Sequence, residues 1–497
     1  MGFSSSDITV LLLVLTPLAG GILVTLARRK SLAELITISS ASLVLVQVFL
    51  ILSEVAVKKT LTAFGNSFYI DSFSAVILLP ISLVGFVSVL YSKNYMGRQY
   101  DMGLVDDRHI VRYYQGLNAF LLSMLVVPIT NNMGVMWVTV EATTLVSVLL
   151  IMLYFKENAI EAAWKYLIIA TVGLSFALVG TVFFYYASIN SGATGDAMDW
   201  TGMVQNSKSF NPALVMIAFV FIVVGYGTKA GLAPMHTWLP DAHSEAPTPV
   251  SALLSGVLLN CALYGIIRFR IVTSGAIGKS FPDELLVILA VVSIGIAAAS
   301  IYFQKDMKRM LAYSSVEHMG LVSLGIGFGG LVGIYGAVLQ IINHAIAKPL
   351  MFFASGTISQ RYETKAMSKV RGIIKVMPVT GALFLIGGFA LVGMPPFNIF
   401  LSEFLVLSAG FQGGQFVAVS IVIVFLAVTF AAFLRHLIGM VFGNPAAGME
   451  REEMGRLAII PMAILGLLVI LFGFYIPGQL QALIHDTSVI INGGGFA

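Results

Sequence analysis

Apolar stretches of about twenty residues recur along the whole chain, and short polar connectors separate them. Such a stretch is long enough to cross the roughly 30 Å hydrocarbon layer of a bilayer as an α-helix. The pattern therefore predicts an all-α integral membrane protein. We expect about fourteen helices, at about 8–27, 32–53, 69–92, 112–130, 132–155, 162–188, 211–232, 248–272, 284–304, 308–329, 332–360, 376–410, 415–442 and 457–477. No positive segment precedes the first stretch and no small-residue cleavage site follows it, which favours a membrane helix over a signal peptide.

Two of these stretches are interrupted by residues that break helices. The seventh carries Gly231 and Pro234 shortly after Lys229, and the twelfth carries Gly393, Pro395 and Pro396. Non-helical backbone at membrane depth is tolerated only where it is buried in protein or lines a water-filled cavity. We therefore expect helices 7 and 12 to be broken beside a functional path.

Composition narrows the class of protein. The chain is 58% hydrophobic and 10% charged, which excludes an ordinary soluble domain. Its single cysteine, Cys261, can build neither an Fe–S cluster nor a disulfide by itself. We expect no cofactor and no metal in this chain, and the formal charge of +4 needs no nucleic acid to explain it.

The basic residues predict an orientation. Of the 28 Lys and Arg, 18 follow odd-numbered helices and six follow even-numbered ones. Basic loops stay in the cytoplasm, so both termini are expected outside it, in a prokaryotic cell membrane. The larger group includes Arg28 and Lys308, and the smaller includes Arg268 and Arg270. Four basic residues remain in or near the apolar spans: Lys165, Lys229, Lys348 and Arg435.

The chain also carries an internal repeat. Glu141 aligns with Glu317 at an offset of 176, and Lys165 aligns with Lys348 at an offset of 183. Equivalent helices of the two repeats are five helices apart. Because five is an odd number, the second repeat would cross the membrane in the opposite direction to the first. Paired broken helices in inverted repeats indicate a transport path near the midplane.

We predict four regions: 1–110, helices 1–3; 111–273, the first half (helices 4–8); 274–443, the second half (helices 9–13); and 444–497, helix 14 and a tail.

The first half offers Glu141, Lys229 and Lys165 as candidates. Glu141 lies mid-span, where an isolated carboxylate is strongly disfavoured, and a lysine partner lowers that cost. Burial disfavours the charged form of Lys229, which suits a group that loads and releases protons. A static ion pair is the alternative. Lys165 lies about one turn inside its span. Its side chain is therefore as well suited to extending to the cytoplasmic surface as to taking part in the proton path.

The second half offers a polar stripe. Gln340, His344 and Lys348 recur every four residues and so share one helix face, with Pro349 weakening the helix beside them. This arrangement is typical of a proton relay. Glu403 would end the row near the outer side, unless it is an interfacial carboxylate. Glu317 and His318 are weaker candidates, and the glycine-rich 325–330 segment favours close helix packing over a phosphate loop.

The connector after the first break is polar. It carries His236, Asp241, His243 and Glu245, which have no thiolate partner or compact metal-site spacing. We therefore expect this connector to form a hydrated wall beside Lys229 and not a metal site.

Three stretches resemble a known family: GTKAGLAPMHTWLPDAHSEAPTPVSALLSG, the NHAIAKPL helix and the GMPPFNIFLSEF break. They are similar to the antiporter-like proton-pumping subunits of respiratory complex I, Mrp-type Na⁺/H⁺ antiporters and membrane-bound hydrogenases. LAYSSVEHMG and PPFNIFLSEF are most similar to component F of hydrogenase-4-type complexes. The resemblance covers nearly the whole chain.

The resemblance implies roles for individual residues. Glu141 would pair with Lys229, His344 and Lys348 would form a central relay, and Glu403 would be the distal exchange residue. Many relatives from complex I carry a lysine in helix 8, where this chain has Asn260, so the halves must connect through water and polar groups such as Ser251, Ser255, Tyr264 or His344. The chain ends about twenty residues after helix 14 without a long lateral helix, which favours an interior position in the complex.

The expected function is that of a proton-translocating, non-redox membrane subunit of a redox-driven complex of the hydrogenase-4 or complex I type. Its partners would be other antiporter-like and quinone-site-type membrane subunits, with peripheral hydrogenase or Fe–S subunits reached indirectly. A subunit of an Mrp-type Na⁺/H⁺ antiporter, a structural scaffold and a carbon-uptake complex are the alternatives.

Overall fold

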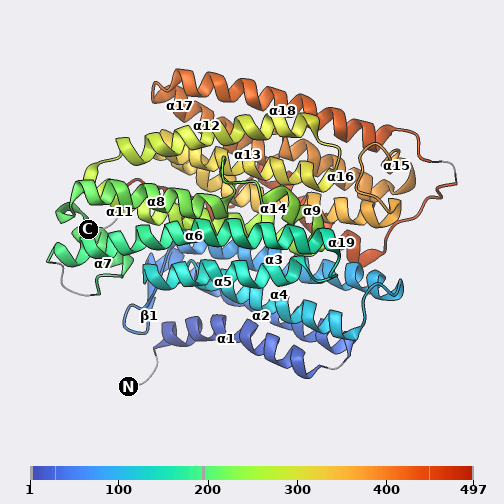
Figure 1. Cartoon of the computed structure of the whole chain (residues 1–497), viewed down its shortest axis with the longest axis horizontal. Helices are drawn as coiled ribbons and strands as arrows, with labels where there is room; N and C mark the ends of the chain where they lie inside the picture. Colours follow the sequence, from blue (N-terminus) through green and yellow to red (C-terminus); the bar gives the residue numbers. More distant parts are fainter. Residues whose placement is uncertain (1–3, 28, 193–195, 447, 495–497) are drawn as a thin grey trace.

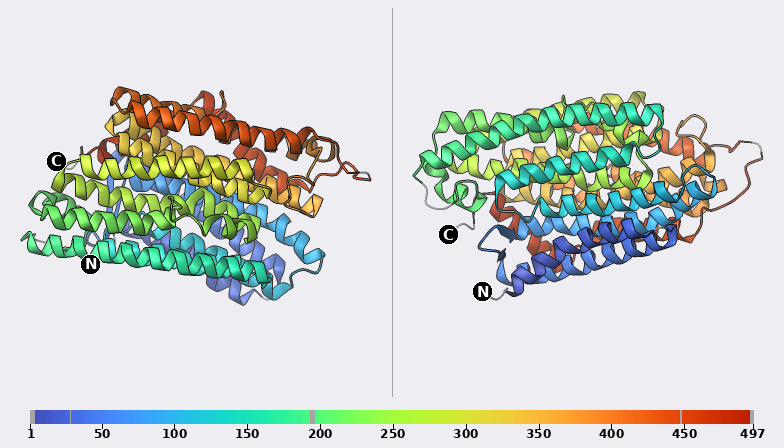
Figure 2. Two further views of the ribbon diagram at one scale, coloured as in Figure 1. Left: turned by 45° about the horizontal axis from the view of Figure 1, so that its top comes forward. Right: turned by 60° about the horizontal axis from the view of Figure 1, so that its bottom comes forward.

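The protein is a bundle of long, roughly parallel helices, as the apolar pattern predicts (Figures 1 and 2). The computed structural model describes residues 4–27, 29–192, 196–446 and 448–494. The helices of the first half of the chain are α1 (Ser5–Leu26), α2 (Lys30–Lys58), α3 (Ser72–Asp101), α4 (Asp107–Val126), α5 (Met133–Ile151), α6 (Glu157–Asn190), α7 (Trp200–Asn206), α8 (Pro212–Ala230), α9 (Leu239–Glu245), α10 (Thr248–Leu253) and α11 (Leu259–Ile277). Those that follow are α12 (Ser280–Phe303), α13 (Met307–Phe328), α14 (Gly330–Tyr362), α15 (Ile373–Val376), α16 (Pro378–Leu391), α17 (Asn398–Gln412), α18 (Phe416–Phe442), α19 (Arg456–Phe474) and α20 (Gly478–Ile491).

Short elements outside the long helices were not expected from the sequence. Strands β1 (Thr60–Ala63) and β2 (Phe68–Asp71) form an antiparallel hairpin with Thr60 opposite Asp71. Helix α7 and the short 3₁₀ helix η1 (Ser207–Ser209) occupy the connector before α8, and α20 occupies the tail. The hairpin and α7 lie at the end of the bundle where α1 begins, and α15 lies at the opposite end (Figure 1).

Within the described residues, eleven helices are long and apolar enough to span a membrane. The expected helices 4, 10 and 12 correspond to α4, α13 and the pair α16–α17, which fall outside that set. Helices α4 and α13 carry several charged residues, and α16 and α17 are short because the break divides them. The all-α membrane fold is confirmed, whereas the count of fourteen spans stays a prediction.

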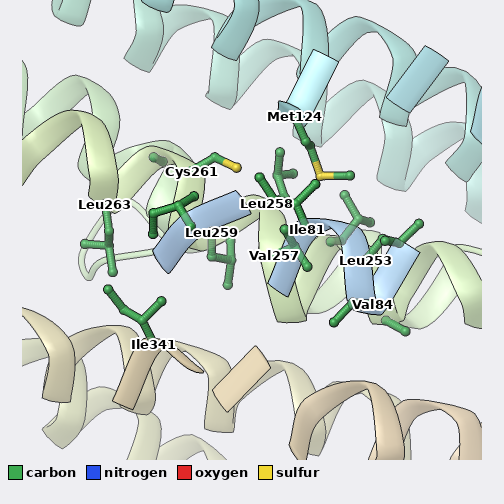
Figure 3. Packing of buried hydrophobic residues seen from close by; sticks show 14 of the residues in the cluster. Ile81, Val84, Met124, Leu253, Val257, Leu258, Leu259, Cys261, Leu263 and Ile341 are labelled. Carbon is green, nitrogen blue, oxygen red and sulfur yellow. The ribbon is translucent and has the colours of Figure 1, made fainter. Parts of the chain in front are cut away.

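The centre of the bundle is the continuous segment Thr248–Ile277, where the turn η2 (Leu254–Leu258) joins α10 to α11. Leu253, Val257 and Leu258 pack there near Ile81 and Val84 of α3 (Figure 3). Gly256 lets Pro349 of α14 approach closely, since a Cβ at this glycine would lie 2.9 Å from the proline ring. The segment from the first break therefore runs through the core and contacts the helix that carries Lys348.

The first break lies between α8 and α9 and its backbone groups are paired. Gly231 ends α8 in the left-handed region at φ 77°, which favours glycine. The Leu232 amide donates to the Gly227 carbonyl at 2.9 Å, and the Ala233 amide donates to Ser293 Oγ of α12 at 2.9 Å. Part of the connector that we expected to be unwound is helical, because Leu239–Glu245 forms α9.

The second break lies between α16 and α17. Gly393 adopts φ 64°, and the Met394 amide donates to the Phe389 carbonyl at 3.0 Å. Helix α17 then begins at Asn398. Both expected helix breaks are therefore present, while the division of the chain into inverted halves stays a prediction.

Two arginines that we assigned to a loop lie inside α11. Arg268 makes a double hydrogen bond with Asp71, both contacts at 2.7 Å, and Arg270 donates to Asp283 at 2.8 Å. Both are buried, because each guanidinium is matched by a carboxylate. Lys308, also expected in a loop, is buried in the first turn of α13, and Arg28 lies outside the described residues. These residues give no information on orientation, which stays a prediction.

Candidate functional site

Lys229 lies buried in the last turn of α8, immediately before the first break. Its ammonium donates to Thr144 Oγ1 of α5 at 2.6 Å and to the Tyr166 hydroxyl of α6. It also lies 4.7 Å from the centroid of the Tyr166 ring. A cation is favoured at this position because the carbonyl end of a helix carries partial negative charge. Hydroxyls and an aromatic face thus solvate a lysine that has no access to bulk water.

Glu141 lies at the same corner of the bundle, but it makes no ion pair with Lys229 within 4.0 Å in the described structure. One of its oxygens accepts from Thr171 Oγ1 at 2.9 Å, and the other has no hydrogen-bond partner among the described residues. Thr144, which contacts Lys229, lies one helical turn beyond Glu141 on α5. The direct pairing of Glu141 with Lys229 that we expected is therefore absent among the described residues.

Lys165 is not buried beside Lys229. Its side chain is 49% exposed and pairs with Glu161 at 2.6 Å and with Asp241 at 3.5 Å. Its counterpart in the predicted repeat, Lys348, is fully buried. Of the two possibilities left open by the sequence, the structure places Lys165 at the surface.

The segment after the first break packs onto the lysine site. The Trp238 indole donates to the Thr228 carbonyl at 2.8 Å and stacks on Tyr166 with ring centroids 4.4 Å apart. His236 is nearly buried, with its ring 6.1 Å from that of Tyr313. The stacked pair of Tyr166 and Trp238 therefore packs against the break, and Tyr166 contacts Lys229.

Helix α9 is held by charged groups from several helices. Asp241 pairs with Arg309 at 2.5 Å as well as with Lys165, and Glu245 pairs with Lys365 at 3.1 Å. The carboxylates thus serve as ion-pair partners, and the hydrated wall that we expected stays a prediction. The described residues contain no group of three or more His, Cys, Asp or Glu side chains that could hold a metal ion.

In the second half, Lys348 is buried in α14 and reaches α13. Its ammonium donates to the Leu311 carbonyl at 3.0 Å and to the Ser314 hydroxyl. His344, one turn earlier, is also buried, and neither of its ring nitrogens has a hydrogen-bond partner among the described residues. The His318 ring lies 5.5 Å from it. His318 thus belongs to the same cluster as His344, and Glu317 beside it is buried as well.

A hydrogen-bond network that we did not predict joins this cluster to the second break. Gln340 contacts His318 Nδ1 at 2.7 Å and accepts from Ser402 Oγ of α17 at 2.5 Å. Asn343 donates to Ser402 Oγ at 3.1 Å and to the Asn398 carbonyl at 2.8 Å. Asn398 and Ser402 follow the Pro395–Pro396 pair at a spacing of four, a signal that could have identified them.

Glu403 lies against the second break. Its Oε2 occupies the space beside Gly393, where an added Cβ would lie 1.9 Å away. Its neighbour in sequence, Ser402, belongs to the network through its hydrogen bond to Gln340. No hydrogen bond or ion pair joins Glu403 to His344 or Lys348 in the described part of the chain.

The two halves touch through hydroxyls. Ser255 of η2 and Ser315 of α13 lie 2.7 Å apart. Asn260 donates to the Gly256 carbonyl at 2.9 Å, and its side-chain oxygen has no partner among the described residues. Tyr264, another residue that we considered for this connection, instead lies beside Ser74 and the Pro128 carbonyl, each at 3.2 Å.

Comparisons with known proteins agree with this arrangement. The family model for the NADH:quinone oxidoreductase/Mrp antiporter membrane region matches residues 130–429, and that for the N-terminus of complex I chain 5 matches residues 62–114. A hydrogenase-4 component F homolog from Methylacidiphilum infernorum is 37% identical over 428 residues, which cover 86% of this chain and 89% of the relative.

Solved structures share the fold. A chain of the membrane-bound sulfane sulfur reductase, an archaeal respiratory membrane complex, is 26% identical, with a TM-score of 0.87 and 98% of each chain covered. A chain of the Mrp complex from Dietzia sp. is 19% identical, with a TM-score of 0.83 over 98% of this chain and 97% of that chain, which shows the fold alone. Both are parts of multi-subunit membrane complexes. The chain belongs to the family of membrane subunits shared by NADH:quinone oxidoreductases and Mrp antiporters.

Proposed function

We propose that this chain translocates protons as a non-redox membrane subunit of a redox-driven complex of the hydrogenase-4 type. The observation that carries the proposal is the pair of buried lysines, Lys229 and Lys348, each hydrogen-bonded to hydroxyls inside the bundle. Ionisable groups are rare inside membrane proteins and usually mark an ion pathway. The similarity to a hydrogenase-4 component F homolog supports the choice of complex.

In this proposal Lys229 is the first site to load a proton. Tyr166 and Thr144 hold its ammonium, and the carboxylate of Glu141, one turn before Thr144 on α5, favours the charged form. A shift of Glu141 towards or away from Lys229 would then change how tightly the proton is held. The exposed Lys165 takes no part in this step.

The second half passes the proton towards the second break. Lys348, His344 and His318 form the inner part of the route, and Gln340 with Ser402 carries it to α17. Glu403 is the exchange residue near the far side of the membrane. Water would fill the remaining gaps, including the contact between halves at Ser255 and Ser315.

Electron transfer would take place in partner subunits and not in this chain. The membrane partners would be other antiporter-like and quinone-site-type subunits, with peripheral hydrogenase or Fe–S subunits reached indirectly. We place the chain in a prokaryotic cell membrane with both termini outside the cytoplasm. The 18-to-6 distribution of basic residues supports this orientation, although Lys308, Arg268 and Arg270 are buried within helices.

The test is Lys229→Met in the intact complex, assayed in inverted membrane vesicles. Methionine keeps the apolar stem and removes the proton-carrying group, so we expect donor-driven proton uptake to be lost at normal assembly. The matched control is Lys369→Met, at an exposed position. Normal uptake by Lys229→Met would make the chain a structural scaffold, and Na⁺/H⁺ exchange without an electron donor would assign it to an antiporter.

A further inference from the structure

A vestibule lined by both charged and apolar side chains opens at the end of the bundle that carries α15. Its volume is about 620 Å³, and its walls come from the end of α3, the segment before α6, the end of α9, the start of α13 and the end of α14. Tyr95, Gln360, Glu245, Lys365 and Lys308 are among its lining residues. The basic loops of the chain gather at this end, so the orientation proposed above places the vestibule on the cytoplasmic side.

Lys308 is one of the residues that line this vestibule. It is 4% exposed, whereas the Lys365 side chain is about a third exposed. The Lys308 ammonium donates to the Ala246 carbonyl, just beyond α9, at 2.9 Å. No ion pair within 4.0 Å involves Lys308 in the described part of the chain. A lysine that lines an open cavity and is nevertheless buried can exchange protons with water on one side only.

Helix α13 connects this lysine to the interior. Lys308, Leu311, Ser314 and His318 recur at spacings of three and four and therefore share one face of the helix. The Leu311 carbonyl and the Ser314 hydroxyl are the two groups that bind Lys348. Ser314 lies six residues beyond Lys308, about 9 Å along the helix axis. One helix face thus leads from the vestibule to the buried lysine of the second half.

His243 of α9 lies near both lysines, because its ring stacks on Phe352, four residues beyond Lys348 on α14, and Ala246, which binds Lys308, is three residues beyond His243. The charges of both Lys308 and Lys348 act on it, and its ring stacks on Phe352 of α14 with centroids 5.4 Å apart. It is fully buried. An imidazole can accept a proton on one nitrogen and release one from the other, so this position suits a bridge between Lys308 and Lys348.

We propose that the vestibule is a second proton entry, which loads the second half in the same pumping cycle in which Lys229 loads the first, and that Lys308 is the residue that takes up the proton there. This inference rests on the proposed function. Neutral Lys308 accepts a proton from vestibule water, and the resulting ammonium releases one through His243 and intervening water to Lys348. Glu245 of α9, Asp306 at the start of α13 and Lys365 are the charged groups whose fields act on Lys308.

A purely structural role for Lys308 is the competing explanation, since it caps the Ala246 carbonyl. Lys308→Arg separates the two roles. Arginine retains the charge and the hydrogen-bond donors but does not release its proton at physiological pH. If Lys308 carries protons, donor-driven uptake by the intact complex in inverted vesicles falls about tenfold or more. The control is Lys369→Arg at an exposed position of the same end, where uptake stays at the wild-type rate.

If Lys308→Arg takes up protons at the wild-type rate, the inference is overturned, and the role of Lys308 is to cap the Ala246 carbonyl. If Lys308→Arg lowers assembly, Lys308→Ala is assayed with azide, a small weak acid that carries protons but supplies no cationic cap. Rescue of the uptake rate per assembled complex supports the entry role, and absence of rescue overturns it. Lys229→Met is measured in parallel to separate two failures. Normal proton uptake by Lys229→Met would reject the proposed function itself. Lost uptake in Lys229→Met together with normal uptake in Lys308→Arg would reject only the role of Lys308 as the proton entry.

Discussion

Trp238 stacks on Tyr166 with ring centroids 4.4 Å apart, and this contact links the first helix break to the lysine site. The Tyr166 hydroxyl contacts Lys229, while the Trp238 indole binds the Thr228 carbonyl at 2.8 Å. Lys229 before the break and Trp238 after it therefore meet at Tyr166. A change in the protonation of Lys229 would reach α9 through this stacked pair.

Tyr166→Phe tests the hydroxyl without disturbing the stack. Phenylalanine keeps the aromatic face but removes a hydrogen bond to a charged group, which contributes about 1.5–3 kcal/mol. We expect donor-driven proton uptake to fall roughly tenfold with normal assembly. The measurement is the initial rate in inverted vesicles, with Tyr113→Phe as the control, since Tyr113 bonds to Ser92 far from Lys229. An unchanged rate would mean that Thr144 suffices to hold Lys229.

Ser402→Ala tests the network at the second break. The substitution removes the hydroxyl that joins Gln340 of α14 to Asn343 and to α17. We expect uptake to fall several-fold while the electron-transfer rate of the complex falls less, because only the proton route is interrupted. Ser420→Ala, on the exposed face of α18, serves as the control. Equal rates in both variants would show that the proton does not use this network.

Gly393→Ala tests the space that Glu403 occupies. An added Cβ would lie 1.9 Å from Glu403 Oε2, so the carboxylate must move, and the positive φ of 64° adds strain. Gly414→Ala provides the matched comparison, because its φ is 73° but no heavy atom lies within 4 Å of its Cβ. We expect Gly393→Ala to lose most uptake and Gly414→Ala to lose only some thermal stability. Similar uptake in both would remove the functional role of Glu403.

Asp71→Ala tests the stability of the buried pair with Arg268. Removing one partner leaves a buried guanidinium uncompensated, which costs about 3–5 kcal/mol. The thermal midpoint of the purified complex should fall clearly, and assembly with it. Asp486→Ala removes an exposed pair with Lys59, worth about 0–1 kcal/mol, and should leave the midpoint almost unchanged. Equal midpoints would indicate that water reaches Arg268.

The sequence by itself determined the membrane class, the helix breaks and most of the candidate residues. Apolar length fixes the class, because a stretch of about twenty apolar residues is stable only in a bilayer or a fully buried core. Glycine and proline limit where a helix can continue, so both breaks were visible at Gly231 and Gly393. The stripe of Gln340, His344 and Lys348 follows from helical spacing alone.

Tertiary structure decided which of these residues meet. Lys229 binds Thr144 and Tyr166 and not Glu141, because the helix crossing places hydroxyls nearer than the carboxylate. Arg268, which we assigned to a loop, is buried, since Asp71, distant in sequence, folds against it. Contacts between residues far apart in sequence depend on helix packing and rotation, which hydropathy does not specify. The vestibule that Lys308 lines is built from five such segments, so only the folded chain could reveal it.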